Sequence, residues 1–193
     1  MFSLLQEIFQ INRPLVFFVY GLVFFLLGLA ILLQSRQHSR LILARSLHWL
    51  ALFGVSHGLY EWGDVFIPLQ RTYLAAPIIA LLQMGQIGLL AFSFTCLFQF
   101  AVNLLRPLPK AWRWLRWLPA TVLLLWSLAA LIGLTGLAIS FPTWLTVTNI
   151  TARYLIGWPA ALLAAYGLRY QTLKLIAPLH EPRILRMLKL ASL

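Results

Sequence analysis

Apolar residues fall into five long runs that are separated by short polar or proline-containing links. These runs cover, in chain order, about residues 14–34, 41–62, 73–105, 118–139 and 152–176. A helix of about 20 predominantly apolar residues is long enough to cross the hydrocarbon core of a bilayer. Every run reaches that length, so the pattern predicts an all-α polytopic membrane protein with five transmembrane helices.

The remaining residues divide into two flanking segments and the links between the runs. Residues 1–13 have an apolar helical face, which predicts a short segment at the membrane interface. Residues 14–176 form the predicted transmembrane domain, and the basic residues 177–193 form a predicted cytoplasmic tail. Within the domain we expect an acidic link over 61–72 and an uncharged loop over 140–151.

Composition agrees with a membrane protein. Hydrophobic residues make up 62% of the chain and charged residues only 10%, whereas a soluble globular domain has about 25% charged residues. The single cysteine, Cys96, excludes an internal disulfide and a CxxC metal site. The signatures HExxH and GxSxG, the P-loop and the dinucleotide fingerprint do not occur in the sequence, so we do not expect an enzyme.

Lysine and arginine gather on one side of the predicted membrane. Twelve of the fifteen lie in the link after the first run, in the link after the third run, or near the C-terminus. The other side holds Arg13, Arg71 and Arg153. Because positive charge marks the cytoplasmic side, we expect the N-terminus outside and the C-terminus in the cytoplasm, in a bacterial inner membrane.

The most basic link, RPLPKAWRWLRW, interleaves arginine and lysine with three tryptophans. A net charge of +11 is compatible with nucleic-acid binding, but the basic residues sit at the ends of apolar runs. Aromatic and basic residues in such places are typical of a membrane interface. We therefore expect contacts with membrane lipids and none with nucleic acid.

The end of the second run holds the candidate site, because two of the four acidic residues, Glu61 and Asp64, lie there. His57 precedes Glu61 by four residues, so the two side chains share a helical face and can meet. An ionisable pair just inside a membrane is costly and is by default a functional-site candidate. We expect these three residues to form a ligand or proton site open to the outer side. The alternative is a polar cluster that only marks the helix end.

The third run carries Gln83 and Gln86 near its middle, in the segment QMGQIG. Amides at this depth usually bond across helices, so one interpretation is a purely structural contact. The other is that both amides line a ligand cavity shared with His57, which Gly85 and Gly88 would let a neighbour or a ligand approach.

Small residues indicate where helices come close. Gly21 and Gly28 are seven residues apart in the first run and share a face, which favours close approach of another helix. In the last run glycine and alanine form a stripe around Pro159, and a proline inside a helix can kink it.

The main alternative to a chain without a cofactor is one that binds haem through a histidine. His48 lies nine residues before His57, on the opposite helical face, and the other four runs contain no histidine. A haem would therefore need a non-histidine second ligand or a second copy of the chain. We expect no cofactor and no metal, with haem b at His48 or His57, or a quinone, as the alternative.

The segment LLQSRQHSRLILARSLHWLALFGVSHGLYEWGDVFIPLQ joins an apolar run, a basic link of the SRxxSRLxLARSL type and a helix ending in HGLYEWGD. Over about residues 14–105, this arrangement resembles the N-terminal membrane region of some bacterial sensor histidine kinases. The matching positions are His57, Gly58, Glu61, Trp62, Gly63 and Asp64. The resemblance implies an input module of a two-component system. The 193 residues contain neither a phosphoacceptor-histidine helix nor an ATP-binding domain, so kinase activity is not expected of them.

Together these observations favour a membrane-embedded sensory module that passes a signal to a cytoplasmic partner or domain. We expect it to act as a homodimer or with another signalling protein. The first alternative is a small accessory subunit of a respiratory or photosynthetic membrane complex, whose apolar faces would pack on partner helices. The second is a haem- or quinone-binding membrane protein.

Overall fold

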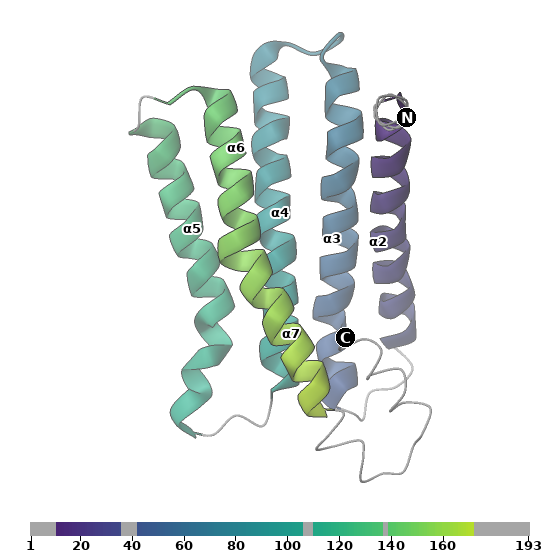
Figure 1. Cartoon of the computed structure of the whole chain (residues 1–193), viewed down its shortest axis with the longest axis vertical. Coiled ribbons are helices and arrows are strands. Elements are labelled where there is room, and N and C mark those ends of the chain that lie inside the picture. Colours follow the sequence, from purple (N-terminus) through teal and green to yellow (C-terminus); the bar gives the residue numbers. More distant parts are fainter. Residues whose placement is uncertain (1–10, 36–41, 106–109, 137–138, 172–193) are drawn as a thin grey trace, which may run out of the picture.

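The computed structural model describes residues 11–35, 42–105, 110–136 and 139–171 (Figure 1). Within these ranges all regular structure is helical, which confirms the predicted all-α fold for them. The elements are α2 (Arg13–Ser35), α3 (Ile42–Gln70), α4 (Ala76–Leu104), η1 (Lys110–Trp117), α5 (Leu118–Thr135), α6 (Phe141–Thr151), η2 (Ala152–Gly157) and α7 (Trp158–Gln171). η1 is a 3₁₀-helix and η2 is a π-helix. Most of the predicted interfacial segment and the whole predicted tail lie outside the described residues.

The helices lie side by side along the long axis of the molecule, with α3 between α2 and α4 (Figure 1). α4 is the central element, because it packs against α3 and also against α5, α6, η2 and α7. Leu90, Ala91 and Cys96 in its middle are fully buried. α6, η2 and α7 follow one another without a break, so they form one long helix that changes direction beside α4 (Figure 1).

Three helices are long and apolar enough to cross a membrane: Arg13–Gln34, Ala76–Leu104 and Arg113–Thr135. This finding supports the prediction of a membrane protein. α3 and the long helix from α6 to α7 also run the length of the bundle (Figure 1), and they carry most of the polar side chains described below. The count of five spans and the orientation in the membrane stay predictions.

α3 continues beyond the predicted end of the second run. It extends to Gln70 and includes Pro68, so the prediction of a link over 61–72 is wrong for most of that segment. Val65 and Ile67 keep the helix apolar here, and Ile67 is buried in the bundle. Glu61 therefore lies well inside the helix and not at its end.

The predicted loop over 140–151 is also wrong, because residues 141–151 form α6. Ser140 caps this helix by accepting a hydrogen bond from the backbone N–H of Thr143, and Pro142 lies in the first turn, where proline is tolerated. The hydroxyl of Thr148 donates to the carbonyl of Trp144 one turn back. Such bonds satisfy hydroxyl groups inside the helix, which explains why a stretch rich in threonine is helical.

Glycines bring α2 and α3 into backbone contact, as predicted for Gly21 and Gly28. A methyl group at Gly28 would lie 2.6 Å from the backbone nitrogen of Val55 and 2.7 Å from the carbonyl oxygen of Ala51. One at Gly58 of α3 would lie 2.6 Å from the carbonyl oxygen of Gly21. The absence of side chains at these positions therefore sets the spacing of the two helices.

Candidate functional site

His57 and Glu61 are buried side by side on the face of α3 that meets α4. The Nε2 atom of His57 lies 3.5 Å from Oε1 of Glu61, and its Nδ1 atom lies 3.1 Å from the hydroxyl oxygen of Ser93. Their exposed fractions are 4% for His57 and 3% for Glu61. The predicted meeting of these two residues is therefore observed, and Ser93 of α4 completes the group.

Hydrogen bonding fixes where the protons of this group lie. The Ser93 hydroxyl donates its one proton to the carbonyl of Leu90, at 2.7 Å, so it accepts from Nδ1–H of His57. The other ring nitrogen, Nε2, faces the Glu61 carboxyl group. Two lone pairs facing each other in a buried place are unfavourable, so we infer that one of the two groups carries a proton on the side facing the other. The pair is then neutral overall, whichever residue holds that proton.

Aromatic rings enclose the His57 imidazole. Its ring centroid lies 4.8 Å from that of Phe24, 5.2 Å from Phe53, 5.4 Å from Phe94 and 5.8 Å from Tyr60. With both nitrogens already engaged and rings around it, His57 has no ring nitrogen directed at open space. This geometry does not favour His57 as a haem ligand.

His48 is exposed on the other side of α3 from His57, as its nine-residue spacing predicted. Its imidazole lies against the neighbouring Trp49, with 5.1 Å between ring centroids. Within the described ranges, no group of three or more histidine, cysteine, aspartate or glutamate residues is arranged to hold a metal ion.

A second polar group links α3 to the long C-terminal helix. The Tyr60 hydroxyl accepts hydrogen bonds from Nδ2 of Asn149 at 2.8 Å and from Nη2 of Arg153 at 3.0 Å. Nε of Arg153 donates to Oδ1 of Asn149 at 2.8 Å, and the guanidinium group lies over the Tyr60 ring. We call Tyr60, Asn149 and Arg153 the Tyr60 cluster. It holds α3 against α6 and η2.

The π-helical turn of η2 presents Arg153 to this cluster. The backbone N–H of Trp158 donates to the carbonyl of Arg153, five residues back, as in a π-helix. Pro159 follows directly and has no N–H to donate to the carbonyl four residues earlier. The proline and the π turn thus interrupt the regular hydrogen bonding of the long helix at the level of Tyr60.

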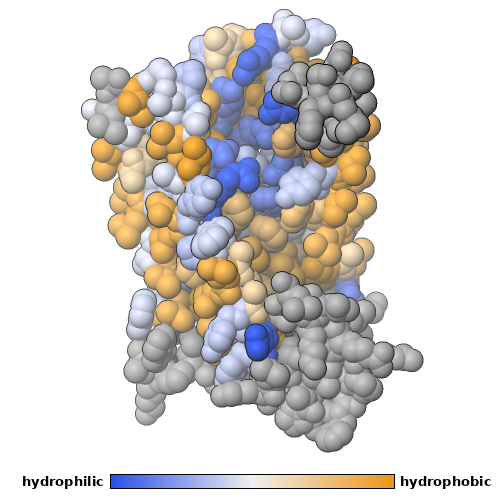
Figure 2. Space-filling model, in the orientation of Figure 1, coloured by the Kyte–Doolittle hydropathy of each residue, from blue (hydrophilic) through white to orange (hydrophobic). Residues whose placement is uncertain are grey.

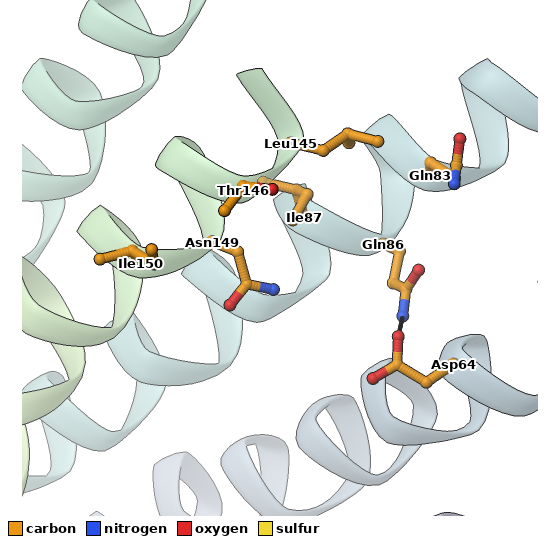
Figure 3. A pocket seen from close by; sticks show the side chains of 8 residues that line it. All are labelled: Asp64, Gln83, Gln86, Ile87, Leu145, Thr146, Asn149 and Ile150. Atoms are coloured by element: carbon orange, nitrogen blue, oxygen red, sulfur yellow. Dashed lines mark hydrogen bonds between the residues drawn. The ribbon is translucent and has the colours of Figure 1, made fainter. Parts of the chain in front are cut away.

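Gln86 of α4 connects to α3 beside the Tyr60 cluster. Its Nε2 donates to Oδ1 of Asp64 at 2.8 Å (Figure 3). It also donates to the backbone carbonyl of Tyr60 at 3.1 Å. Gly63 makes room for this contact, because a methyl group there would lie 2.7 Å from the Gln86 amide. The amide thus bonds across helices, in agreement with the structural interpretation of this residue.

The same residues line a hollow of about 310 Å³ between α3, α4 and α6 (Figure 3). We call it the amide hollow, and its lining residues are Asp64, Gln83, Gln86, Ile87, Leu145, Thr146, Asn149 and Ile150. Figure 2 shows hydrophilic residues gathered in the upper half of the molecule, where these helices lie in Figure 1, with hydrophobic residues around and below them. The bundle thus has a polar region at the end where α3 finishes and α4 begins.

A second hollow, of about 500 Å³, lies on the other side of Asp64 and Gln86. We call it the arginine hollow, because Arg13 at the start of α2 and Arg71 just after α3 line it. Apolar side chains that include Phe17 and Ile67 complete its wall. Asp64, Gln83 and Gln86 line both hollows.

The structure therefore divides the predicted site in two. Asp64, Gln83 and Gln86 line the hollows, whereas His57 and Glu61 are packed in the bundle and are not among the lining residues. Neither of these two hollows is a cavity that the glutamines share with His57, so that interpretation of the sequence stays a prediction.

Tyr60, Ser93, Asn149 and Arg153 were not among the predicted site residues. The spacing of Asn149 and Arg153 could have predicted their contact, since an amide and an arginine four residues apart share a helical face. That prediction depends on reading residues 141–151 as a helix. Tyr60 lies one residue before Glu61, and nothing in the sequence alone pairs it with a residue about ninety positions away.

No family model, curated protein or solved structure matches this chain. The resemblance to sensor histidine kinase input regions therefore stays a prediction that depends on the residues quoted for it.

Proposed function

We propose that the chain is a membrane-embedded sensory module that binds a small polar ligand at Asp64 and Gln86 and transmits the binding event along its long C-terminal helix. One observation carries the proposal. The helix from α6 to α7 lines the amide hollow with its first turns and continues to the opposite end of the bundle. A ligand that displaces α6 would therefore displace α7.

The contacts of this helix suggest how displacement is transmitted. Near its start, Asn149 lies between the hollow and Tyr60. At its far end Gly167 packs on Leu104 of α4, and Gln171 donates a hydrogen bond to the Leu104 carbonyl. Between the two ends, the π turn and Pro159 interrupt the backbone hydrogen bonds. Interrupted helices of this kind bend at the interruption, so η2 is the expected hinge.

In the proposed topology, input and output lie on opposite sides of the membrane. With the N-terminus outside and the C-terminus in the cytoplasm, as the lysine and arginine distribution predicts, both hollows open near the outer surface. Gln171 then lies near the cytoplasmic surface, where an output partner or domain would receive the signal. A bacterial inner membrane fits this arrangement.

A second candidate function is that of an accessory subunit in a larger membrane complex. Most residues of the spans Arg13–Gln34 and Arg113–Thr135 are exposed in the described chain. Their apolar faces are available to lipid or to the spans of partner subunits, and an accessory subunit would use them for packing.

Gene deletion and complementation in the host of origin separate these two functions. For a sensory module we expect deletion to change a defined set of transcripts, and the wild-type gene to restore them. Q86L should fail to restore them at equal membrane levels, because it removes the amide between Asp64 and Tyr60. Q99L, the same substitution further along α4 and away from both hollows, should restore them.

Full restoration by Q86L and by D64N would contradict the proposed site. If deletion leaves transcripts unchanged but removes other subunits from a membrane complex on a native gel, the accessory-subunit function replaces the sensory one.

A further inference from the structure

We infer that the ligand of this site is a zwitterion, with an ammonium group held at Asp64 and Gln86 and a phosphate or carboxylate group held at Arg13 and Arg71. The inference rests on the proposed ligand-binding function and names the chemical class of the ligand. Its basis is the set of hydrogen-bonding groups that the two hollows offer.

Two of the three residues that line both hollows, Asp64 and Gln86, offer acceptors to a ligand. The Gln86 amide nitrogen has two protons, and it donates them to Asp64 and to the Tyr60 carbonyl. What Gln86 retains for a ligand is its amide oxygen, which only accepts. The Asp64 carboxylate likewise only accepts when ionised. A ligand group that fits beside them is a donor, and an ammonium group supplies three N–H donors together with the charge opposite to that of Asp64.

The arginine hollow offers the opposite chemistry at its rim. Among the described residues the one ion pair is His57–Glu61, so no described carboxylate neutralises Arg13 or Arg71. Guanidinium groups bind carboxylate and phosphate groups through paired N–H donors. Arg71 follows Asp64 by seven residues, which corresponds to about 10 Å along a helix. Asp64 and Gln86 line the same hollow as Arg13 and Arg71, so one ligand in it can contact both pairs.

Size and position are consistent with such a ligand. The arginine hollow, of about 500 Å³, falls within the usual range of small-molecule sites, roughly 300–1,000 Å³. Phe17 and Ile67 in its wall can pack against the hydrocarbon part of the ligand. The same chemistry is present in free amino acids and phosphoethanolamine compounds and in the headgroup of phosphatidylethanolamine.

Thermal unfolding of the full chain in an uncharged maltoside detergent tests the inference. The probes are the zwitterions glycerophosphoethanolamine, glycine and γ-aminobutyrate, the cation ethanolamine and the anion glycerol phosphate. We expect at least one zwitterion to raise the unfolding midpoint at a concentration about tenfold or more below that of either single-charge probe, because two charge-assisted contacts act together.

Variants test which residue binds each charged group of the ligand. D64N should remove the advantage of the zwitterion over glycerol phosphate, and R71Q should remove its advantage over ethanolamine. R169Q, an exposed arginine at the other end of the bundle, is the matched control and should leave both advantages unchanged. R71Q lies after the end of α3 at an exposed position, so it tests the inference even if D64N does not fold.

A second set of measurements, in nanodiscs, distinguishes a free ligand from a lipid headgroup. Stabilisation by soluble zwitterions indicates a free ligand, whereas stabilisation only in nanodiscs containing phosphatidylethanolamine, compared with phosphatidylglycerol alone, indicates a lipid headgroup. If no zwitterion stabilises the protein in either set of measurements, or if ethanolamine alone is as effective, the inference is overturned. The complementation of Q86L would then still decide the proposed function independently.

Discussion

His57 and Glu61 show how a buried ionisable pair can be kept inside an apolar bundle. Each side chain is buried, and the ring is fixed by Ser93 on one nitrogen and by the carboxyl group on the other. With one of the two groups protonated, as inferred from their contact, the pair carries no net charge, which avoids most of the cost of burying an ion. The His57 ring also lies beside the ring of Tyr60, with 5.8 Å between their centroids, and Tyr60 is the residue that Arg153 contacts.

Two substitutions of similar size at Glu61 test this proton-sharing arrangement. In E61Q the amide donates an N–H to Nε2 of His57, so the contact is retained and the unfolding midpoint should change little. In E61L that nitrogen loses its partner in a buried place, which costs about 1–3 kcal/mol and corresponds to about 2–4 °C per kcal/mol for a chain of this size. Thermal unfolding in detergent gives both values. Equal midpoints for E61Q and E61L would contradict the arrangement.

At the scale of elements, the pairing of α2 with α3 depends on backbone contact through glycines. Gly28 lies against the backbone of Ala51 and Val55, and Gly58 lies against that of Gly21. Gly85 of α4 is a useful contrast, because apart from its own stretch of helix no heavy atom lies within 4 Å of where its methyl group would be. The glycines of one chain therefore separate into those that a neighbouring helix requires and those that face open space.

G28A and G85A form a matched pair for this element. G28A should force α2 away from α3 and lower stability by about 1–3 kcal/mol, as overpacking of a close contact does. G85A should be neutral or slightly stabilising, because alanine favours the helix by up to about 1 kcal/mol over glycine. The unfolding midpoints of the two variants give the comparison. A stable G28A protein would mean that the α2–α3 contact is not as close as described.

At the scale of the whole molecule, sequence periodicity predicted the features that depend on one helix at a time. The apolar runs, the meeting of His57 with Glu61 and the shared face of Gly21 and Gly28 all follow from spacing along a single helix. Contacts between helices could not be predicted from this spacing. The Arg153–Tyr60 contact joins residues far apart in the chain, and it became visible only once the hydroxyl-rich stretch before Arg153 was known to be helical. The two hollows depend on how three helices pack, which no local pattern encodes.

The orientation of the whole molecule remains a prediction from charge, and labelling of single cysteines tests it. Thr72 and Ser140 are exposed at the end of the bundle that should face outward, and Arg116 is exposed at the opposite end. In intact cells a membrane-impermeant thiol reagent should label T72C and S140C and should label R116C only after permeabilisation. The native Cys96 is buried and serves as the internal background. The reverse pattern would place both hollows on the cytoplasmic side, and the proposed ligand would then have to be a cytoplasmic metabolite or an inner-leaflet lipid.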